Sequence, residues 1–317
     1  MAELPRTPAA GPAAGPHRVS PGPDGRTTVA IITRDRRESL LRTLDHLAGL
    51  PERPPVVVVD NGSTDGTAEA VRDHRAGVRL LCPGRNTGAL GRNLAVRSAD
   101  TPYVAFSDDD SWWAAGALRT AADLFDAHPH LGLLAARTLV GPEYAEDPLN
   151  DALATSPLPR RTGLPGTPVL GFLACSAVVR RTAFLDTGGY HSLLFFGAEE
   201  TLLAYDLAAS GWGVAYEPSV TSHHCPDPGA RPGRAPALLR NEVLTQWLRR
   251  PLPVALGGTA GLLSGALRGR PGAAAALRGV LGRLPRALGQ RRPLPPHVER
   301  AVRLVEQSRH GPRQAWS

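Results

Sequence analysis

The chain of 317 residues contains no lysine, so all 36 basic side chains are arginine. We attribute this to coding bias, and arginine abundance alone therefore indicates little about function. Cysteine is scarce too: the three cysteines stand apart, with no C-x-x-C pair, which argues against a zinc ribbon or a disulfide framework. The N-terminal residues M-A-E-L-P-R-T-P lack the apolar segment of a signal peptide, so we expect a cytoplasmic location.

Acidic residues are almost missing from the C-terminal part of the chain. Residues 231–317 hold 16 arginines and 3 acids, a net charge of +13, whereas residues 26–230 hold 18 arginines and 24 acids, a net charge of −6. No acid stands between Glu242 and Glu299. This difference in charge predicts a domain at 26–230 and a basic helical extension at 231–317. The high Pro, Ala and Gly content of residues 1–25 predicts a disordered tail.

The extension combines its charge with apolar stretches. Residues 251–267 are uncharged and Gly-rich, and 17 residues are marginal for a spanning helix. Basic and apolar character together favour docking of residues 251–292 on an anionic membrane surface, at the inner face of the cell membrane. The alternative is a helical subdomain packed on the body, which we favour for residues 235–250. No nucleic-acid-binding motif accompanies the charge, so nucleic acid is not an expected partner.

Short β-branched runs alternate with amphipathic stretches in the first part of the domain. Strands are predicted at 28–33, 56–59 and 78–81, with helices between them. This alternation is typical of βαβ units, so the predicted fold class is α/β, with a mostly parallel sheet flanked by helices. Asp35 and Glu38 resemble a capping box at the first helix. Further along, the Pro- and Gly-rich residues 141–168 are expected to form a long loop, and residues 214–216 and 219–221 two short edge strands.

Three consecutive acids, Asp108, Asp109 and Asp110, follow a buried strand predicted at 103–106. The carboxyl end of such a strand is where open α/β sheets bind their ligands. Three adjacent carboxylates repel one another, so we expect a cation among them. Mg²⁺ or Mn²⁺ prefers oxygen ligands and often completes its shell with substrate phosphates. The alternative is a solvated acidic turn.

Six stretches of the chain, in order, resemble the family 2, GT-A-fold, nucleotide-sugar-dependent glycosyltransferases over about residues 28–225. They are A-I-I-T-R (30–34), V-V-V-V-D-N-G-S-T-D-G-T (56–67), N-T-G-A-L-G-R-N (86–93), S-D-D-D (107–110), G-G-Y-H (188–191) and A-E-E-T-L-L-A-Y-D-L-A-A-S-G-W (198–212). The resemblance implies a GT-A domain that transfers a sugar, with inversion, from a nucleotide-diphosphate donor. The acceptor would be a hydroxyl of a glycan or a lipid-linked molecule, in cell-envelope synthesis.

The resemblance also implies which residues hold the donor. Thr33, Arg34 and Asp60 would contact the nucleotide, with Asp60 on the base. Asn86 belongs to the same donor-binding set. Arg92 would lie near the diphosphate. For Asp60 the alternative is a helix-capping acid, and for Arg92 a solvated position on a helix.

Asp108 and Asp110 match the two acids of the D-x-D motif, which reaches the ribose and the metal in this family. Asp109 would assist at the nucleotide sugar or remain solvated. His223 or His224 matches the place where such enzymes often supply a further metal ligand. Histidine favours Mn²⁺ over Mg²⁺ as the ion. A structural role for both histidines is the alternative.

Glu199 and Glu200 stand where relatives carry Glu-Asp. The second acid would be the general base that deprotonates the acceptor hydroxyl, and this chain has one more methylene there. The alternative role, which Glu199 fits well, is an acid that complements the dipole at a helix N-terminus. At the level of function, two alternatives remain: a non-catalytic nucleotide-sugar-binding or scaffold protein, and a nucleotidyltransferase. The second needs a phosphate-binding loop after the first strand, where this chain has T-R-D-R-R-E.

Overall fold

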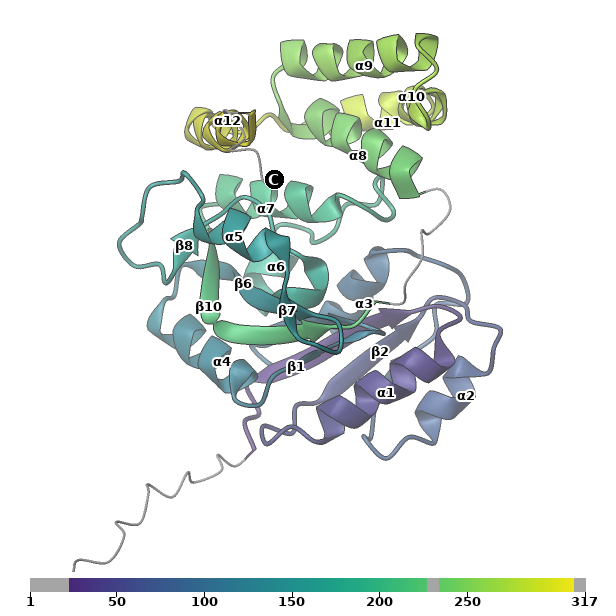
Figure 1. Ribbon diagram of the computed structural model, residues 1–317, viewed down its shortest axis with the longest axis vertical. Coiled ribbons are helices and arrows are strands. Elements are labelled where there is room, and N and C mark those ends of the chain that lie inside the picture. Colours follow the sequence, from purple (N-terminus) through teal and green to yellow (C-terminus); the bar gives the residue numbers. More distant parts are fainter. Residues whose placement is uncertain (1–22, 227–233, 311–317) are drawn as a thin grey trace, which may run out of the picture.

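A computed structural model describes residues 23–226 and 234–310 (Figure 1). The predicted disordered tail lies outside the described residues up to residue 22. The strands are β1 (Thr27–Thr33), β2 (Val56–Asp60), β3 (Arg79–Leu81), β4 (Tyr103–Asp108), β5 (Ser111–Trp113), β6 (Leu131–Val140), β7 (Ala145–Glu146), β8 (Thr167–Pro168), β9 (Ala177–Arg180) and β10 (Gly213–His224). The helices are α1 (Arg37–Ala48), α2 (Thr67–Arg72), α3 (Leu90–Ser98), α4 (Ala117–Ala127), α5 (Pro148–Ala154), α6 (Arg181–Asp186), α7 (Glu199–Ala209), α8 (Arg234–Arg249), α9 (Leu252–Leu267), α10 (Ala273–Leu281), α11 (Leu284–Gly289) and α12 (Pro296–His310), with a 3-10 turn at Ala174–Ser176.

One mixed sheet, flanked by helices, forms the centre of the molecule. Its strand order is β3-β2-β1-β4-β9-β6-β10-β5, and β7 and β8 add short pairs to β6 and β10. The first four strands of this order run parallel, and β9 is antiparallel to both of its neighbours. The predicted α/β class, with a mostly parallel sheet, is confirmed.

The direction of the strand order reverses beside β1, and this reversal positions the site. The chain proceeds outward from β1 to β2 and β3, then returns through α3 to β4 on the other side of β1. Thr33 lies opposite Asp60 in the register, and Ile32 lies opposite Asp108. The carboxyl ends of three strands therefore meet at a topological switch point, where α/β sheets of this kind bind ligands.

Hydrogen bonds join the loops that follow β1 and β2. The capping box that we predicted at Asp35 and Glu38 is wrong. Asp35 does not cap α1; its Oδ1 accepts the backbone N–H of Thr64 at 2.7 Å. The first N–H of α1, at Arg37, is instead donated to Asp65 Oδ2 at 3.1 Å. The free backbone N–H at the start of α1 is thus bonded by a side chain of the loop after β2. The spacing of residues in the sequence does not reveal this pairing, because the two partners are far apart in the chain.

The second half of the body differs from its prediction in two places. Residues 141–168 contain β7, α5 and β8 instead of one long loop. The two predicted edge strands are one strand, β10, which runs inside the sheet between β6 and β5. Its register to β6 shifts between Glu217 and Thr221, around Pro218. Proline has no backbone N–H to donate to a neighbouring strand. Pro218 therefore interrupts the strand pattern in the sequence, which led to the prediction of two short strands instead of one.

Alternating residues of each central strand point to opposite apolar layers. On β1, Ala30 and Ile32 belong to the core beneath α3, α6 and α7, whereas Val29 and Ile31 belong to the core beneath α1 and α4. All four side chains are buried. A sheet covered on both faces explains why the strands read as continuous apolar runs.

The C-terminal helices form a further layer above α7 (Figure 1). Leu194 and Leu202 of the body share a core with Leu248 of α8 and Ala255 of α9. Ion pairs join the same elements: Arg249 Nη2 lies 2.9 Å from Asp206 Oδ2 of α7. Residues 235–250 therefore pack on the body, as the subdomain alternative predicts for them. The division at residue 230 stays a prediction. In the described ranges, no helix combines the length and apolarity needed to cross a bilayer.

Candidate active site

The acidic cluster forms a tight turn at the end of β4. Asp109 and Asp110 are buried, and Asp108 is half-buried. The backbone N–H of Asp108 donates to the hydroxyl of Ser111 at 2.7 Å, which closes the turn before β5. The solvated-turn alternative for the acids is therefore wrong for Asp109 and Asp110.

Two arginines supply positive charge to these acids within the described part of the chain. Arg36 Nε lies 3.2 Å from Asp109 Oδ1, and its Nη2 lies 3.2 Å from Asp110 Oδ2. Arg92 Nη2 pairs with Asp108 Oδ1. Sequence reasoning expected a cation among the acids but did not identify Arg36. Its only sequence signal is a place three residues past the end of β1, in a run with several arginines.

The charge on the cluster is still not fully compensated. Burial, together with the negative charges of Asp110 and Asp108, raises the pKa of Asp109 to about 6, although Arg36 and the hydroxyl of Thr33 act in the opposite direction. Thr33 Oγ1 donates to Asp109 Oδ2 at 3.0 Å. The site therefore favours additional positive charge near these carboxylates.

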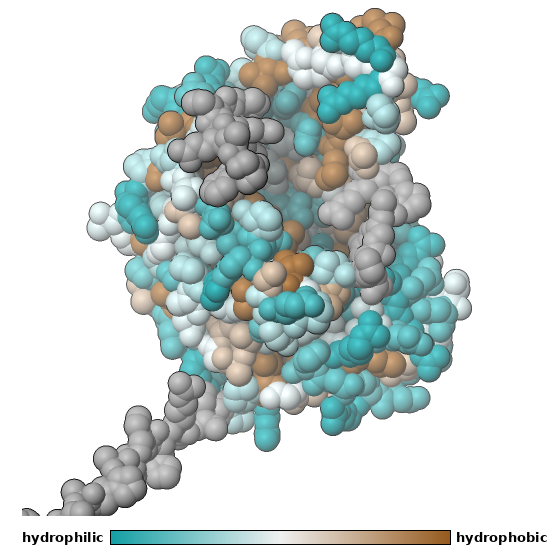
Figure 2. Space-filling model, in the orientation of Figure 1, coloured by the Kyte–Doolittle hydropathy of each residue, from teal (hydrophilic) through white to brown (hydrophobic). Residues whose placement is uncertain are grey.

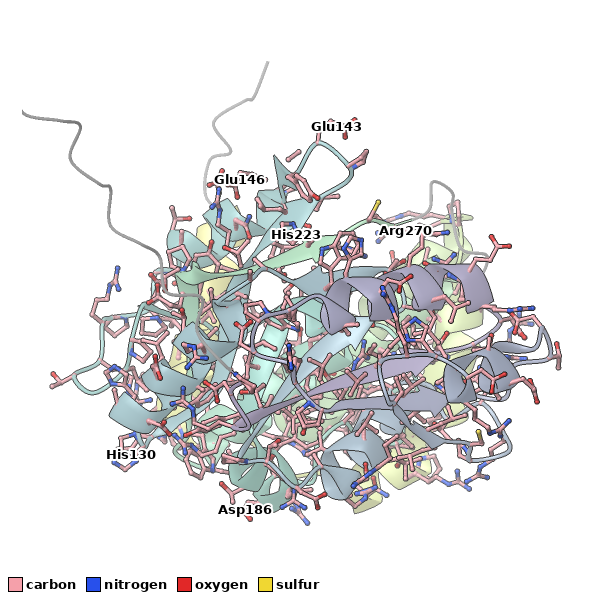
Figure 3. The ribbon with its side chains drawn as sticks, turned by 90° about the horizontal axis from the view of Figure 1, so that it is seen from below. His130, Glu143, Glu146, Asp186, His223 and Arg270 are labelled. Carbon is pink, nitrogen blue, oxygen red and sulfur yellow. The ribbon has the colours of Figure 1, made fainter. Side chains whose placement is uncertain are left out.

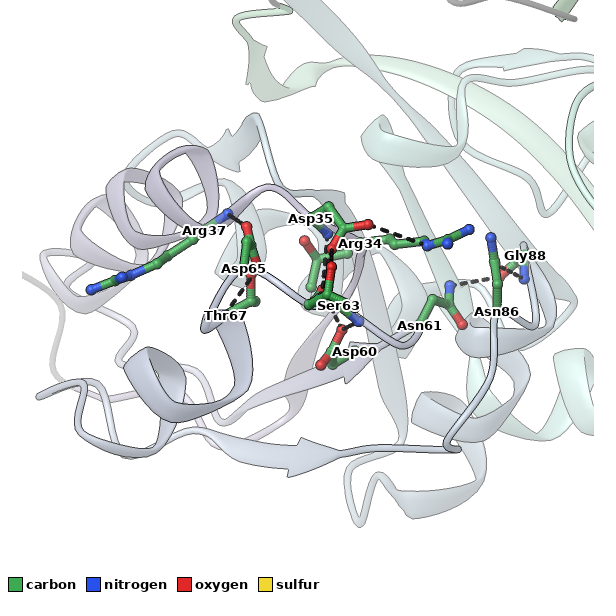
Figure 4. Close-up of polar contacts among 12 residues, drawn as sticks. Arg34, Asp35, Arg37, Asp60, Asn61, Ser63, Asp65, Thr67, Asn86 and Gly88 are labelled. Atoms are coloured by element: carbon green, nitrogen blue, oxygen red, sulfur yellow. Dashed lines mark hydrogen bonds and ion pairs between the residues drawn. The ribbon is translucent and has the colours of Figure 1, made fainter.

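A first cavity of about 510 Å³ lies at the ends of β1 and β4. It is lined by Ile32, Thr33, Arg34, Arg36, Asn61, Asn86, Gly88, Asp108, Asp109, Phe195 and Phe196. Five predicted donor-binding residues thus share one cavity. Asp60, which we also predicted there, does not line it; its Oδ1 accepts the N–H of Ser63 at 2.9 Å, in the adjoining loop (Figure 4).

Asn61 and the two phenylalanines are lining residues that sequence reasoning missed. Asn61 Nδ2 donates to the carbonyl of Gly88 at 3.2 Å, and its Oδ1 accepts the N–H of Thr87 at 3.1 Å, so it ties two walls of the cavity together (Figure 4). Gly88 has a φ of +59°, and a Cβ there would lie 2.3 Å from the carbonyl oxygen of Phe195. Only glycine lets these backbones approach so closely.

A second cavity of about 360 Å³ adjoins the first, because Asp108 and Phe196 line both. Its lining includes Arg92, Glu199, Glu200 and His224, all of which were predicted site residues. The residues that the two cavities share place the acidic cluster between the predicted nucleotide residues and the predicted base.

Arg92 is a buried residue of this second cavity, so the solvated-helix alternative is wrong. Its side chain is 1% exposed, and it stacks over the rings of Phe106 and Tyr190 at 5.9 and 5.8 Å. Within the described residues, its Nε and Nη1 have no hydrogen-bond partner. Buried guanidinium nitrogens are costly to leave unpaired, so this arrangement suits an anion entering the cavity.

Glu199 and Glu200 begin α7, which is the place that their alternative role requires, but they differ in their surroundings. Glu199 is 2% exposed, and its Oε2 has no hydrogen-bond partner among the described residues. Burial and the charge of Glu200 raise the pKa of Glu199 to about 8, against a lowering by Arg92. Glu200 is half-buried and lines the cavity. Two adjacent carboxyls in different environments can hold different protonation states.

The two histidines point to opposite faces of β10. His224 Nε2 lies 3.5 Å from Asp110 Oδ1; burial lowers its pKa, but Asp110 outweighs this and the net pKa is raised. The ring of His223 instead packs against Trp112 and Tyr144, with ring centroids 5.7 and 4.7 Å apart. Figure 3 shows His223 beside the turn that carries Glu143, which leads into β7 with Glu146. The structure therefore does not support His223 as a metal ligand.

The predicted metal residues do not form a complete preformed centre. Within residues 23–226 and 234–310, no three His, Cys, Asp or Glu side chains are grouped as a metal site. The chemistry of Asp108, Asp110 and His224 nevertheless fits a divalent ion, since two carboxylates and one imidazole suit Mn²⁺. The raised pKa of Asp109 agrees with this fit.

Together, the switch-point sheet, the acidic cluster and the adjoining cavities define an α/β protein of the nucleotide-binding kind. Comparison with known families narrows this class. The family model described as glycosyl transferase family 2 matches residues 28–188. The chain belongs to this family, and it is a glycosyltransferase.

Individual relatives agree with this assignment. An N-acetylglucosaminyl-diphospho-decaprenol L-rhamnosyltransferase of Mycobacterium tuberculosis is 28% identical over 283 residues, which cover 74% of this chain and 91% of the relative. Among solved structures, S. aureus TarS 1–349 in complex with UDP-GlcNAc has a TM-score of 0.59 at 18% identity, covering 90% of this chain and 92% of that one. The mannosyltransferase PcManGT from Pyrobaculum calidifontis, with GDP-Man and Mn²⁺, has a TM-score of 0.54 at 22% identity, covering 95% and 92%. These two structures support the GT-A fold.

Proposed function

We propose that this protein is an inverting glycosyltransferase that moves a sugar from a nucleotide-diphosphate donor to an acceptor hydroxyl. One observation carries the proposal: Asp108 lines both the cavity of the predicted nucleotide residues and the cavity of the acidic pair. A donor that spans the two would have its nucleotide in the first cavity and its sugar facing the second.

Donor binding is assigned to residues at the strand ends. Thr33, Arg34 and Asn86 line the first cavity and would contact the nucleotide, whereas Asp60 would act from the adjoining loop on the base. Arg92 would bind the diphosphate through the nitrogens that lack protein partners in the described chain. Charge-assisted hydrogen bonds from arginine to phosphate are strong and directional.

A divalent cation, Mn²⁺ or Mg²⁺, would be held by Asp108, Asp110 and His224. When bound, it supplies neutralisation of the diphosphate leaving group. The protein's own part is to hold these carboxylates in one turn and to place Arg92 beside them. Solved relatives in complex with Mn²⁺ support a metal in this fold, PcManGT among them.

Glu200 is the proposed general base. It would accept the proton of the acceptor hydroxyl as that oxygen attacks the anomeric carbon from the side opposite the diphosphate, which inverts the configuration. The partial exposure of Glu200 suits a group that meets an incoming acceptor. Glu199, with a pKa of about 8, would remain protonated near neutral pH and leave the negative charge on Glu200.

The acceptor is proposed to be a lipid-linked glycan intermediate in cell-envelope synthesis. Glu200 and Phe172 line the second cavity and also a third one of about 450 Å³. Leu153, Val169 and Val305 give this third cavity an apolar part, which suits an acceptor with a non-sugar portion. The mycobacterial relative is named for an acceptor of this type. Such a substrate would bring the enzyme to a membrane, through residues 251–292.

The test begins with a panel of nucleotide sugars, screened with and without Mn²⁺ for release of nucleoside diphosphate. With the donor identified, Glu200→Gln should lower turnover by roughly 10²–10⁴, the usual contribution of a positioned acid–base group, with donor affinity unchanged. Glu200→Asp should recover part of the loss. Glu143→Gln, at an exposed carboxylate that lines none of these three cavities, is the matched control.

Two outcomes would contradict the assignment. Full activity of Glu200→Gln would place the base elsewhere. Nucleotide-sugar binding with no donor consumption under any condition would favour the scaffold alternative over an enzyme of this kind.

A further inference from the structure

Helix α9 is apolar on every side, although it lies at the outside of the molecule. Its 16 residues contain no charged side chain. Ala255 and Leu262 are buried against the neighbouring helices. On a face about 100° further round the helix, four leucines are exposed: Leu252 by 49%, Leu256 by 57%, Leu263 by 50% and Leu267 by 81%. An outer helix normally has polar residues on that side, so this face calls for an apolar partner.

The four leucines form one stripe. Their spacings of four, seven and four residues place them within an arc of roughly 60°, given about 100° of rotation per residue. We call Leu252, Leu256, Leu263 and Leu267 the leucine stripe. Figure 1 shows α9 as the outermost element of the helical layer, and Figure 2 shows hydrophobic and hydrophilic residues together at that end of the molecule.

Exposed arginines lie on and after the end of α9, and no acid stands between Glu242 and Glu299. Arg268, Arg270, Arg278 and Arg286 are all exposed. The described residues between Glu242 and Glu299 contain no acid that could pair with them. By contrast, Arg250 is buried and bound to Glu299 at 2.8 Å and to Glu306 at 2.6 Å. The arginines near α9 therefore differ from those that hold the helical layer together.

The length of α9 decides between spanning and lying on a bilayer. Sixteen helical residues extend for about 24 Å, less than the roughly 30 Å of the hydrocarbon core. A short helix with an apolar face beside cationic side chains is suited to the interface, with its apolar face at the acyl boundary and its arginines at lipid phosphates.

We infer that α9 docks this enzyme on an anionic lipid bilayer, with the leucine stripe inserted at the interface and Arg268, Arg270, Arg278 and Arg286 on the phosphates. The inference deepens the membrane placement in the proposed function by naming the surface that makes it. The occupant is a lipid surface and not a protein, because every charged side chain in residues 243–298, the segment that carries the stripe, is an arginine. A second copy of the chain would bring the same positive charge against it.

The experiment measures co-flotation of the full-length protein with vesicles of phosphatidylcholine, alone or mixed with phosphatidylglycerol. Binding should require phosphatidylglycerol and weaken in about 1 M salt, where the screening length is only ~3 Å. The double variant Leu256→Gln/Leu263→Gln should lower the partition coefficient by about tenfold or more, because it removes two apolar anchors. Leu304→Gln, at an exposed leucine of α12, should bind as the wild type does.

Two further double variants test whether vesicle binding depends on where the positive charge lies or only on the net charge of the protein. Arg268→Glu/Arg270→Glu should abolish vesicle binding, whereas Arg72→Glu/Arg97→Glu, with the same net charge, should keep it; Arg72 and Arg97 are exposed on the body. All these positions are exposed, so circular dichroism should show folded variants.

Unchanged vesicle binding by the leucine double variant would overturn the inference. So would a wild-type dimer that ignores vesicles and becomes monomeric in that variant, since the stripe would then be a protein interface. The vesicle assay needs neither donor nor turnover, so it fails or succeeds independently of the proposed activity.

Discussion

The protonation state of Glu199 makes a quantitative prediction about stability. This carboxyl is 2% exposed, and burial together with the charge of Glu200 raises its pKa from 4.5 to about 8. Between these two pH values the folded protein keeps a proton that the unfolded chain releases. Folding therefore binds a proton, and the free energy of unfolding falls as pH rises from about 4.5 to about 8.

The magnitude follows from 1.36 kcal/mol per pKa unit. A pH of 7 lies about 2.5 units above the ordinary pKa of this carboxyl. The raised pKa would therefore lower the free energy of unfolding at pH 7 by about 3 kcal/mol. Ionisation is shared between two adjacent carboxyls, so we expect about 1–3 kcal/mol from Glu199 itself. Glu199→Gln resembles the protonated side chain and should remove this loss.

The assay is denaturant unfolding of the wild type and of Glu199→Gln at pH 5, 6, 7 and 8. The two proteins should be similar in stability near pH 5, and the variant should be more stable by about 1–3 kcal/mol near pH 7, with a larger difference at pH 8. Glu143→Gln, at an exposed site, should reproduce the wild-type pH dependence. Parallel curves for the wild type and Glu199→Gln would refute the reasoning, because a buried carboxyl with a raised pKa must contribute such a slope.

Two further predictions concern the metal and the helical layer. Asp110→Ala should abolish the increase in nucleoside diphosphate affinity that Mn²⁺ causes, measured by titration calorimetry; an unchanged increase would remove Asp110 from the metal set. A chain that ends at residue 250 should aggregate, because removal of α9 to α12 uncovers Leu244 and Leu248 of α8 and takes away the ion pairs of Arg250 with Glu299 and Glu306. A soluble, cooperatively unfolding fragment would contradict this second expectation.

Much of the site could be predicted because its parts are local in sequence. Polar residues directly after an apolar strand lie at the carboxyl edge of the sheet, which placed Thr33 and Asp108 correctly. The six family stretches added Arg92 and Glu200, and the structure brings both into one cavity. Arg36 and Asn61 were missed because each acts across the fold: Arg36 reaches the acids after β4, and Asn61 reaches the loop at Gly88.

The roles of His223 and His224 could not be predicted from neighbouring residues in the sequence. Sequence reasoning offered His223 or His224 as a metal ligand without choosing between them, and it expected the edge strand to end at residue 221. In the structure both lie on β10, where successive side chains point to opposite faces, so only one of them can face the acids. Which of them does so depends on how β10 pairs with β5 and β6, and this register places His224 near Asp110. Pairing partners that are distant in the chain carry no local signal, so the sequence could not decide.

By itself, the sequence determined the alternation of strands and helices, the acidic turn and the division of charge, because each follows from the composition and period of neighbouring residues. Only the tertiary structure decided that arginines from two other elements enter the acidic cluster, that β10 lies inside the sheet and that the C-terminal helices share a core with α7. These features depend on contacts between residues far apart in the chain. Their energies come from burial and pairing across elements, and no local pattern records them.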